Sequence, residues 1–503
     1  MKQYFRNLRQ RAGYGAGTME PENHYKNGAN PKNRTGKNHN ASINYKLLSM
    51  IGIFLWSASC APKTGSGAAS SGDEVRLIIL DPGHFHAALV QKTSYPQVGN
   101  EVYVYAPEGE DVAEYLKKIK GYNTRAESPT QWDEKVYTGA DYQEKMLREK
   151  KGNAVVLAGN NGKKTDYIRH AVSAGLNVLS DKPMAISTAD FEQLKECFEI
   201  AGRNKVLLYD IMTERFEITT LLQRAFSRLP AVYGEQQTGT PDDPAVTKES
   251  VHHFFKTVSG NPLIRPVWFF DTEQQGEGIV DVTTHLVDLV QWACFPEQII
   301  RYGTDIELLD ANRWTTSLSP AQFKEVTGRD TYPDYLRKDV RDDTLQVYAN
   351  GDITYRIKGI HARVSVIWNY TYPEGGGDTH YSVMKGSKAH LIIEQGKEQN
   401  YRPVLSIRMA PGMDPEACEK DLLNALTGIT EQYPGVSLHK LKDGLWQVIV
   451  PEHYHNGHEA HFGQVTANFL SFLTEGALPV WEVPNMLAKY YVTTHALELA
   501  KRK

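Results

Sequence analysis

Short aliphatic runs alternate with helical patterns along residues 75–209, and this alternation constrains the fold more than any other feature of the chain. Runs rich in Val, Ile and Leu are expected for parallel strands that are buried on both faces. Strands are predicted over 75–80, 101–106, 154–158, 176–179 and 206–209. Helices are predicted between them, from about residue 85 and over 112–119, 142–150, 166–174 and 189–201. Strands that alternate with helices form βαβ units, so the pattern predicts a doubly wound parallel sheet.

Polar or flexible residues follow three of these strands and mark the expected ligand-binding edge. Gly83, Asn160 and Lys182 each come shortly after a predicted strand. In a doubly wound sheet, ligands bind at the carboxyl ends of the strands, near the point where the strand order reverses. The three segments are therefore predicted to lie at one binding site.

The periodicity changes after residue 210. Short segments there alternate apolar and polar residues, at 345–348, 353–357, 364–368, 381–384 and 389–393. This pattern predicts a largely antiparallel sheet with one polar face, followed by two closing helices over 462–472 and 485–500. A chain of 503 residues is also longer than one hydrophobic core usually supports. The predicted fold class is α/β, with a Rossmann-like doubly wound sheet in residues 74–211 and an α+β substrate-binding domain in residues 212–503.

The first 73 residues are predicted to serve export rather than folding. Residues 1–45 are polar and rich in Asn, Gly and Lys, which indicates a disordered extension. Residues 46–60 then combine Lys46, an apolar run and three small residues before Cys60, which is typical of a secretory signal. A Cys in that place looks like a bacterial lipobox, in which Cys60 would carry the lipid, and 61–73 would be a flexible tether. The alternative is a short buried helix that ends in Cys.

The distribution of charge argues against one class of partner, and the spacing of the cysteines argues against disulfides. The formal net charge is −4, but residues 1–60 hold 9 Lys/Arg and 2 Asp/Glu, so the rest of the chain is clearly acidic. An acidic surface repels phosphate, so no nucleic acid is expected as a partner. Cys197, Cys294 and Cys418 are widely spaced and odd in number, so they are predicted to be free thiols.

Residues 154–185 end in Asp181, Lys182, Pro183, Met184 and Ala185, and residues 278–288 contain Asp281 and His285 four apart. Both stretches resemble the Gfo/Idh/MocA family of nicotinamide-dependent sugar oxidoreductases. The first is similar to the family stretch that ends in Glu-Lys-Pro, with Asp181 in place of Glu, and in the second the family's Asp and His also stand four apart. Residues four apart lie on one face of a helix, so both side chains can reach one ligand.

The resemblance covers roughly residues 75–400, and the HEAHF and KYYVTT stretches are similar to a variant common among exported bacterial members. It implies that Lys182, Asp281 and His285 are catalytic. A Lys or His with a pKa near 7 can accept the hydroxyl proton while a secondary alcohol is oxidised. The resemblance also implies a second domain that often dimerises through its sheet.

The expected cofactor is NAD or NADP, although the glycine fingerprint is incomplete. Aligned to G-x-G-x-x-G, the chain offers Asp81, Gly83 and His86. Ala106 and Pro107 stand where an acidic residue is expected after the second strand, with Glu108 one step further. The predicted cofactor-binding residues are Gly83, His84, His86, Asn160, Asn161, Asp181, Lys182 and Pro183. An alternative for His84 and His86 is that they merely begin an exposed helix.

Further His-rich and aromatic segments suggest the substrate side. Family position places His252, His253 and Lys256 near the substrate. His458 and His461 are three apart on a predicted helix but lack a Cys or an H-E-x-x-H pattern, so no metal site is predicted. Trp368, Tyr370 and Tyr372 could stack on sugar rings or pack within strands.

The predicted function is that of an exported, membrane-anchored lipoprotein enzyme on the periplasmic side of the cell envelope. Its substrate would be a sugar or glycoside. Without a free nicotinamide pool, the enzyme would retain its cofactor and pass through a transient keto-sugar, as in epimerisation or elimination. Two alternatives are a cofactor-free, lipid-anchored carbohydrate-binding protein on the same fold and a metal-dependent hydrolase built on the C-terminal histidines.

Overall fold

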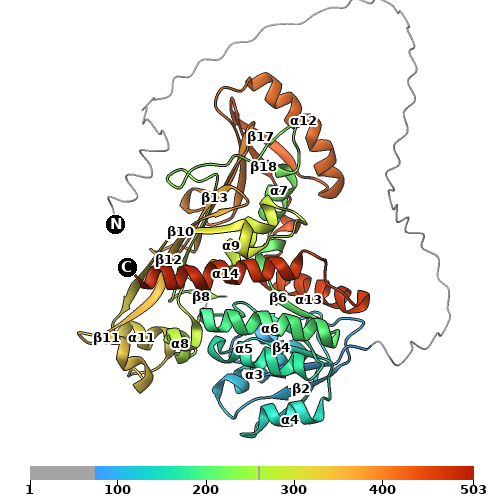
Figure 1. Cartoon of the computed structure of the whole chain (residues 1–503), viewed down its shortest axis with the longest axis vertical. Helices are drawn as coiled ribbons and strands as arrows, with labels where there is room; N and C mark the ends of the chain where they lie inside the picture. The colour runs from blue at the N-terminus through green and yellow to red at the C-terminus, as the bar shows by residue number, and fades with distance from the viewer. Residues whose placement is uncertain (1–73, 259–260) are drawn as a thin grey trace, which may run out of the picture. The chain divides into compact units, whose positions relative to one another are not determined.

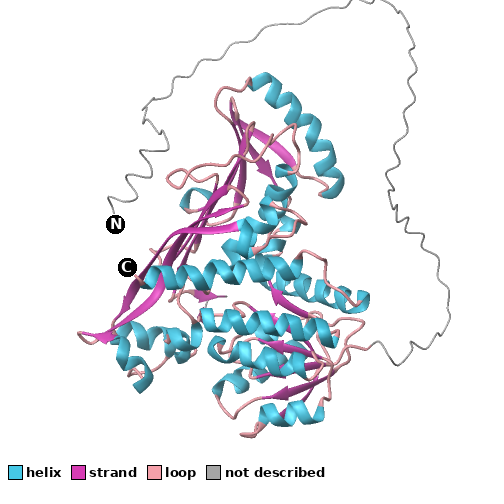
Figure 2. Cartoon of the chain, viewed as in Figure 1, coloured by secondary structure: helices cyan, strands magenta, loops and turns pink. Residues whose placement is uncertain are grey.

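The computed structural model describes residues 74–258 and 261–503. The predicted extension 1–45, signal 46–60 and tether 61–73, with Cys60, lie outside the described residues. Within the described ranges, none of the helices is long and apolar enough to cross a membrane. The two large sheets of this part of the chain lie in separate layers, with helices between and around them (Figures 1 and 2), and β8 and β9 form a third sheet of two strands.

The N-terminal sheet of the described chain has six strands, all parallel, in the order β3-β2-β1-β4-β5-β6. The strands are β1 (Leu77–Leu80), β2 (Glu101–Tyr105), β3 (Asp133–Tyr137), β4 (Ala154–Leu157), β5 (Asn177–Asp181) and β6 (Leu208–Ile211). β1, β4 and β6 are buried at every position, which explains their unbroken apolar or nearly apolar sequences. The strand order reverses between β1 and β4, so ligands are expected beside the loops that follow these two strands.

The helices of this sheet are α2 (His86–Leu89), α3 (Glu110–Thr124), α4 (Tyr142–Glu149), α5 (Asn161–Ser173) and α6 (Thr188–Asn204). α2 is a single turn, whereas the helix after the first strand of a dinucleotide-binding domain usually runs on. The side chain of Ser187 caps α6 by accepting a hydrogen bond from the backbone N–H of Asp190. The side chain of Asn160 caps α5 by accepting a hydrogen bond from the backbone N–H of Gly162.

The second sheet of the described chain has ten strands, in the order β10-β12-β13-β7-β14-β15-β16-β18-β17, with β11 beside β12. Its pairs are antiparallel except β13 with β7, which run parallel. The α/β fold class predicted from the sequence is confirmed. The strands are β7 (Val246–His253), β10 (Ile306–Leu318), β11 (Val340–Arg341), β12 (Thr344–Ile357), β13 (Ile360–Asn369), β14 (Thr379–Lys385), β15 (Ala389–Gln395), β16 (Val404–Met409), β17 (Ser437–Lys442) and β18 (Leu445–Ile449).

Several helices and short strands accompany this sheet. The longer helices are α7 (Ile218–Ser227), α9 (Thr283–Cys294), α11 (Pro320–Thr327), α12 (Pro415–Gln432), α13 (Gly457–Glu475) and α14 (Glu482–Lys501). The shorter elements are α8 (Thr272–Gln275), α10 (Tyr302–Asp305), β8 (Thr257–Val258), β9 (Asn261–Pro262) and the 3-10 turns η1 (Thr213–Phe216), η2 (Val267–Phe270), η3 (Asp334–Asp339), η4 (Lys397–Gln399) and η5 (Glu452–Tyr454).

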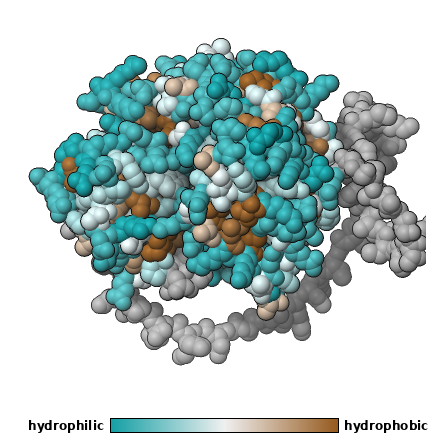
Figure 3. Space-filling view, turned by 90° about the horizontal axis from the view of Figure 1, so that it is seen from below, coloured by the Kyte–Doolittle hydropathy of each residue, from teal (hydrophilic) through white to brown (hydrophobic). Residues whose placement is uncertain are grey.

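Helix α14 belongs to both hydrophobic cores. Met486 and Tyr490 pack into the core around the parallel sheet, while Val492 and Leu497 pack into the core beneath the second sheet. In Figure 1, α14 lies between the two sheets. The face drawn in Figure 3 is largely hydrophilic, with separate hydrophobic patches. Burial of both sides of α14 therefore couples the two halves of the described chain.

Candidate functional site

Lys182 and Asp281 form an ion pair where the parallel sheet meets helix α9. Lys182 directly follows β5, and its Nζ lies 2.5 Å from Oδ1 of Asp281. The peptide bond between Lys182 and Pro183 is cis. Oδ2 of Asp281 accepts a hydrogen bond of 3.1 Å from Nε2 of Gln275. The side chains of Lys182 and Asp281 are 11% and 7% exposed, so the pair is desolvated and its geometry is well defined.

His285 lies one helical turn after Asp281, as the four-residue spacing predicts. Its Nδ1 is buried and has no hydrogen-bond partner among the described residues. Burial, and to a smaller degree the charge of Lys182, lower the pKa of His285 well below its usual value. The imidazole is therefore neutral at pH 7 and can accept a proton.

Asn160 and Asn161 hold the segment that contains α8 against the start of α5. Nδ2 of Asn160 donates to Oε1 of Gln274 at 2.7 Å, and Nδ2 of Asn161 donates to the carbonyl of Gln275 at 2.7 Å. Gln275 also contacts Asp281, so Asn161 supports the ion pair through one intermediate. Their amide nitrogens thus have protein partners, whereas the sequence predicts contacts with a cofactor.

Lys164 contributes to the same site, although the sequence analysis does not select it. It is fully buried and donates to Oδ1 of Asn161 at 2.5 Å and to the carbonyl of Asp181 at 2.9 Å. Burial lowers the pKa of Lys164 to about 8. Its polar contacts fix the backbone of the residue directly before Lys182.

His84, His86 and Asp181 converge beside this backbone. Nδ1 of His86 lies 2.9 Å from Oδ2 of Asp181, and Nδ1 of His84 lies 3.8 Å from the same oxygen. The two imidazole rings meet edge to face, with centroids 4.0 Å apart. His86 also packs against His458 of α13, with ring centroids 5.4 Å apart. The two histidines thus face the end of β5 instead of simply beginning an exposed helix.

His252, His253 and Lys256 gather around Asp378, a residue that the sequence analysis does not select. Asp378 accepts from Nδ1 of His253 at 2.9 Å and from Nζ of Lys256 at 2.8 Å, and Nδ1 of His252 lies 3.6 Å away. The ring of His252 stacks on Trp368, with centroids 4.9 Å apart. Burial lowers the pKa of His252, and the charge of Lys182 contributes in the same direction. This cluster is therefore within electrostatic reach of Lys182.

Glu214 is a further acid–base candidate without a sequence signal. It lies in η1, just after β6, and thus at the same edge of the parallel sheet. Burial and the carboxylate of Glu217 raise the pKa of Glu214 to about 7, against the opposing effect of Lys182. A carboxyl group with this pKa can exchange protons near neutral pH.

A pocket of about 730 Å³ lies at the carboxyl ends of β1 and β2. In a Rossmann domain this position takes the adenosine half of a dinucleotide. The pocket combines aromatic and acidic side chains, and its lining includes Asp81, Glu108, Glu110, Asp111, Trp268 and Tyr335. Its volume and aromatic lining fit a nucleotide.

The turn after β1 fits the dinucleotide only in part. A Cβ on Gly83 would lie 3.2 Å from both the ring of Trp268 and Oδ2 of Asp111, so a larger residue there would require these side chains to shift. Asp81 replaces the first glycine of the fingerprint and has a positive φ of 47°. Its carboxylate accepts from Tyr167 at 2.6 Å and lies 3.3 Å from Nζ of Lys163, which offsets its charge. The pocket and Gly83 therefore fit the cofactor, while Asp81 weakens the phosphate turn.

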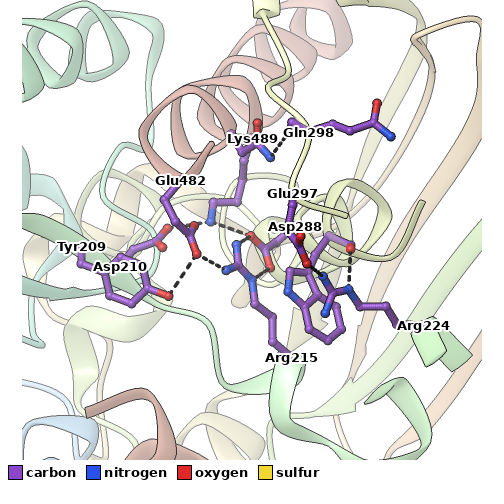
Figure 4. Close-up of polar contacts among 11 residues, drawn as sticks. Tyr209, Asp210, Arg215, Arg224, Asp288, Glu297, Gln298, Glu482 and Lys489 are labelled. Atoms are coloured by element: carbon purple, nitrogen blue, oxygen red, sulfur yellow. Dashed lines mark hydrogen bonds and ion pairs between the residues drawn. The ribbon is translucent and has the colours of Figure 1, made fainter. Parts of the chain in front are cut away.

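A buried ionic network fixes α9 and hence Asp281 and His285 (Figure 4). Arg215 donates to both oxygens of Asp288 at 2.7 Å and to Glu482 at 2.8 Å. Lys489 of α14 lies 2.7 Å from Asp210 and 2.9 Å from Asp288. These residues are at most 8% exposed, so each charge depends on its partners for stabilisation.

Comparisons with known proteins agree with this architecture. Residues 107–209 match the family model described as "Oxidoreductase family, NAD-binding Rossmann fold", and residues 222–501 match "Putative oxidoreductase C terminal domain". The crystal structure of a "putative oxidoreductase" from Parabacteroides merdae is 66% identical, covers 86% of this chain and 98% of its own, and has a TM-score of 0.85. Among curated proteins the chain has no match.

Two more distant structures share the fold alone. A levoglucosan dehydrogenase in complex with NADH and levoglucosan is 12% identical, with a TM-score of 0.55, and covers 85% of this chain and 98% of its own. An oxidoreductase domain protein from Kribbella flavida is 15% identical, with a TM-score of 0.57, and covers 86% of this chain and 98% of its own.

An NAD-binding Rossmann domain joined to a large sheet domain, with a Lys–Asp pair where they meet, defines a nicotinamide-type oxidoreductase. The chain belongs to the Gfo/Idh/MocA oxidoreductase family, in the form that carries the oxidoreductase C-terminal domain.

Proposed function

We propose that this protein is an NAD-dependent oxidoreductase that acts on an alcohol carbon of a sugar or glycoside. The observation that carries the proposal is the 2.5 Å pair between Lys182 and Asp281, with the unpartnered nitrogen of His285 one helical turn away. This arrangement offers a cation to hold a substrate oxygen and a neutral base to take its proton.

Each residue has a distinct role in the proposed reaction. NAD, when bound, supplies the acceptor for the hydride that leaves the alcohol carbon. Lys182 donates a hydrogen bond to the substrate oxygen, and Asp281 keeps the ammonium group in place. His285 accepts the hydroxyl proton as the carbonyl forms, and Glu214 exchanges that proton with solvent.

The acidic lining of the nucleotide pocket supports NAD rather than NADP. Glu108, Glu110 and Asp111 lie beside the end of β2, where a carboxylate accepts hydrogen bonds from a ribose hydroxyl. Glu110 is paired with Arg329, which also lines the pocket, so Glu108 and Asp111 are the carboxylates that would repel the extra phosphate of NADP. Gly83 and Lys163 would face the pyrophosphate, and Lys182 would lie at the nicotinamide end.

The cluster around Asp378 supports a polyhydroxylated substrate. His252, His253 and Lys256 offer donors and acceptors, and the Trp368 ring behind His252 provides an apolar surface. Sugars are recognised by such combinations of polar groups and aromatic faces. An exported location would favour a retained cofactor and a redox-neutral cycle through a transient keto-sugar, ending in epimerisation or elimination.

The test is to purify the full-length chain, denature it and measure released nucleotide by mass spectrometry. We expect NAD in the extract and turnover on a panel of glycosides. Lys182→Ala should lower kcat by about 100-fold or more. It also leaves Asp281 buried without its partner, so the melting temperature should fall, and circular dichroism establishes that the variant is folded at the assay temperature. Lys120→Ala, an exposed lysine of α3, serves as the matched control. Full activity of Lys182→Ala would refute the assignment.

A second candidate function rests on the turn after β1. Asp81 places a carboxylate where the phosphates would lie, and α2 is a single turn, so the chain could be a cofactor-free carbohydrate-binding protein on the same fold. Calorimetry distinguishes the two candidate functions. The binding-protein candidate predicts that the chain binds a glycoside, that it releases no NAD or NADP on denaturation, and that it does not bind either nucleotide when it is added.

We also propose that Cys60 carries a lipid that anchors the protein to the cell envelope on its periplasmic side, and that two copies associate through the antiparallel sheet. The support for the anchor is the sequence pattern of residues 46–60, and the support for the dimer is the family resemblance. Light scattering of the purified chain tests the dimer, because a monomeric mass would exclude it.

A further inference from the structure

Two histidines from one loop and an aspartate from a distant strand form a compact group of ligand-type atoms. His84 and His86 follow β1, whereas Asp181 ends β5, which is separated from β1 by β4. One nitrogen or oxygen from each of the three side chains lies within 4.8 Å of the others. The fold thus brings together residues 95 positions apart in the sequence.

We propose that His84, His86 and Asp181 bind a divalent first-row transition metal ion such as Zn²⁺. Two imidazoles and one carboxylate are a ligand set that such ions favour. The proposal goes beyond the oxidoreductase function and does not depend on it.

The distances lie close enough to those of a metal site for side-chain rotation to complete one. In a tetrahedral site with metal–ligand bonds of about 2.0–2.1 Å, neighbouring ligand atoms lie about 3.3 Å apart. The separations to Oδ2 of Asp181 are 2.9 Å from His86 and 3.8 Å from His84, so they fall on either side of that value. Small side-chain rotations would therefore bring all three atoms to one ion.

A hydrogen-bonded pair explains only part of the group. Nδ1 of His86 and Oδ2 of Asp181 form a hydrogen bond of 2.9 Å. Nδ1 of His84, by contrast, is buried and has no hydrogen-bond partner among the described residues, although it points to the same carboxylate. A buried polar atom without a partner costs about 1–3 kcal/mol, so it calls for an explanation. A metal ion supplies the missing partner.

The charges of Lys182 and Lys164 oppose positive charge at His84 and His86, and the carboxylates of Asp181 and Asp281 offset them. Lys182 is the nearest lysine in sequence, and its charge is already matched by Asp281 at 2.5 Å. Lys164 donates to the main-chain oxygen of Asp181, which leaves the carboxylate oxygens to other partners. Three protein ligands also leave a fourth position for water or for a substrate oxygen. An ion there would polarise an oxygen close to the Lys182 pair.

The experiment uses the full-length chain, stripped with chelator and then titrated with Zn²⁺ by calorimetry. A parallel titration with Co²⁺ is followed by visible absorption, which reports directly on the ligands. We expect one equivalent of either metal per chain. His84→Ala and Asp181→Asn should weaken binding by about 100-fold and reduce the Co²⁺ absorption, since the first removes a ligand and the second removes the negative charge of one. His439→Ala, an exposed histidine of β17, is the matched control and should bind as the wild type does.

Circular dichroism and melting curves establish that each variant is folded, and Asp181→Asn keeps the side-chain size if His84→Ala proves unstable. Failure of the wild type to bind either metal stoichiometrically would overturn the proposal. Metal binding that His84→Ala and Asp181→Asn leave unchanged would also overturn it, because the ligands would then lie elsewhere. NAD content measured in the same samples reports separately on the oxidoreductase function.

Discussion

Arg215 forms two parallel hydrogen bonds of 2.7 Å with Asp288, and this buried pair joins η1 to helix α9. Asp288 lies on α9 less than one turn after His285, so the pair fixes the helix that presents the proposed base. Burial alone would raise the pKa of Asp288, but Arg215 and Lys489 together hold it below its usual value. The network is thus a structural support for the site.

Asp288→Asn should destabilise the fold by about 3–5 kcal/mol, because it leaves Arg215 and Lys489 buried with too little negative charge. Chemical denaturation measures this loss. Asp133→Asn, at an exposed position of β3, is the control and should change stability by less than about 0.5 kcal/mol. A loss of the same small size in Asp288→Asn would show that the network contributes little.

The free energy of unfolding should fall as the pH drops below about 6.5. Burial lowers the pKa of His380 to about 3 and that of His461 to about 4. Below about pH 6.5 the unfolded chain binds protons at these imidazoles and the folded chain does not, so each contributes up to about 1.4 kcal/mol per pH unit.

Denaturation curves between pH 5 and 8 in the presence of chelator measure this slope. His380→Gln and His461→Gln should each make the slope shallower, since each removes one group that gains a proton on unfolding. A wild-type stability that does not change across this range would contradict the prediction.

Glu108→Lys should shift nucleotide preference from NAD towards NADP by about tenfold, because it replaces a ribose-binding carboxylate with a cation that attracts phosphate. Fluorescence titration with both nucleotides measures the ratio of dissociation constants. Glu127→Lys, an equally exposed residue outside the pocket, makes the same charge change and should leave the ratio unaltered. Equal ratios in the two variants would place the adenosine elsewhere.

Cys60→Ser should release the protein from the membrane fraction of an expressing bacterium. The wild type should partition into detergent and carry the added mass of acyl chains, since stable anchoring needs more than one chain. Cys418→Ser serves as the control because it alters a cysteine in the folded part of the chain. If the wild type has the mass of its unmodified chain, Cys60 is not acylated.

The fold is predictable from the sequence where the burial of a strand or helix produces a regular pattern of apolar residues. β1 and β4 are buried throughout and have unbroken aliphatic sequences, so the parallel sheet is evident. β3 was missed because its sequence, DEKVY, is mostly exposed or half-buried. β7 was missed because Lys248 lies in its interior, where Gln223 and Ser382 satisfy the amine at 3.1 and 2.9 Å. Because Gln223 and Ser382 are distant from Lys248 in sequence, the residues around Lys248 give no sign of these contacts.

The candidate site is likewise predictable from the sequence only in part. Lys182, Asp281 and His285 all follow from motifs of the family, and the four-residue spacing adds only that Asp281 and His285 lie on one helix face. The approach of His84 to Asp181 depends on the order of β1, β4 and β5, and Asp378 comes to His253 across 125 positions of sequence. Such contacts depend on tertiary structure, so the periodicity of apolar residues in the sequence does not predict them.

The position of α14 has a consequence for biosynthesis. Because Met486 and Tyr490 complete the core of the parallel-sheet domain, that core stays unfinished until the whole second domain has been translated. Export through a narrow channel requires an unfolded chain, and a domain that waits for its last helix remains translocation-competent. For the export proposed above, shared burial of this late helix would delay folding until the chain has crossed the membrane.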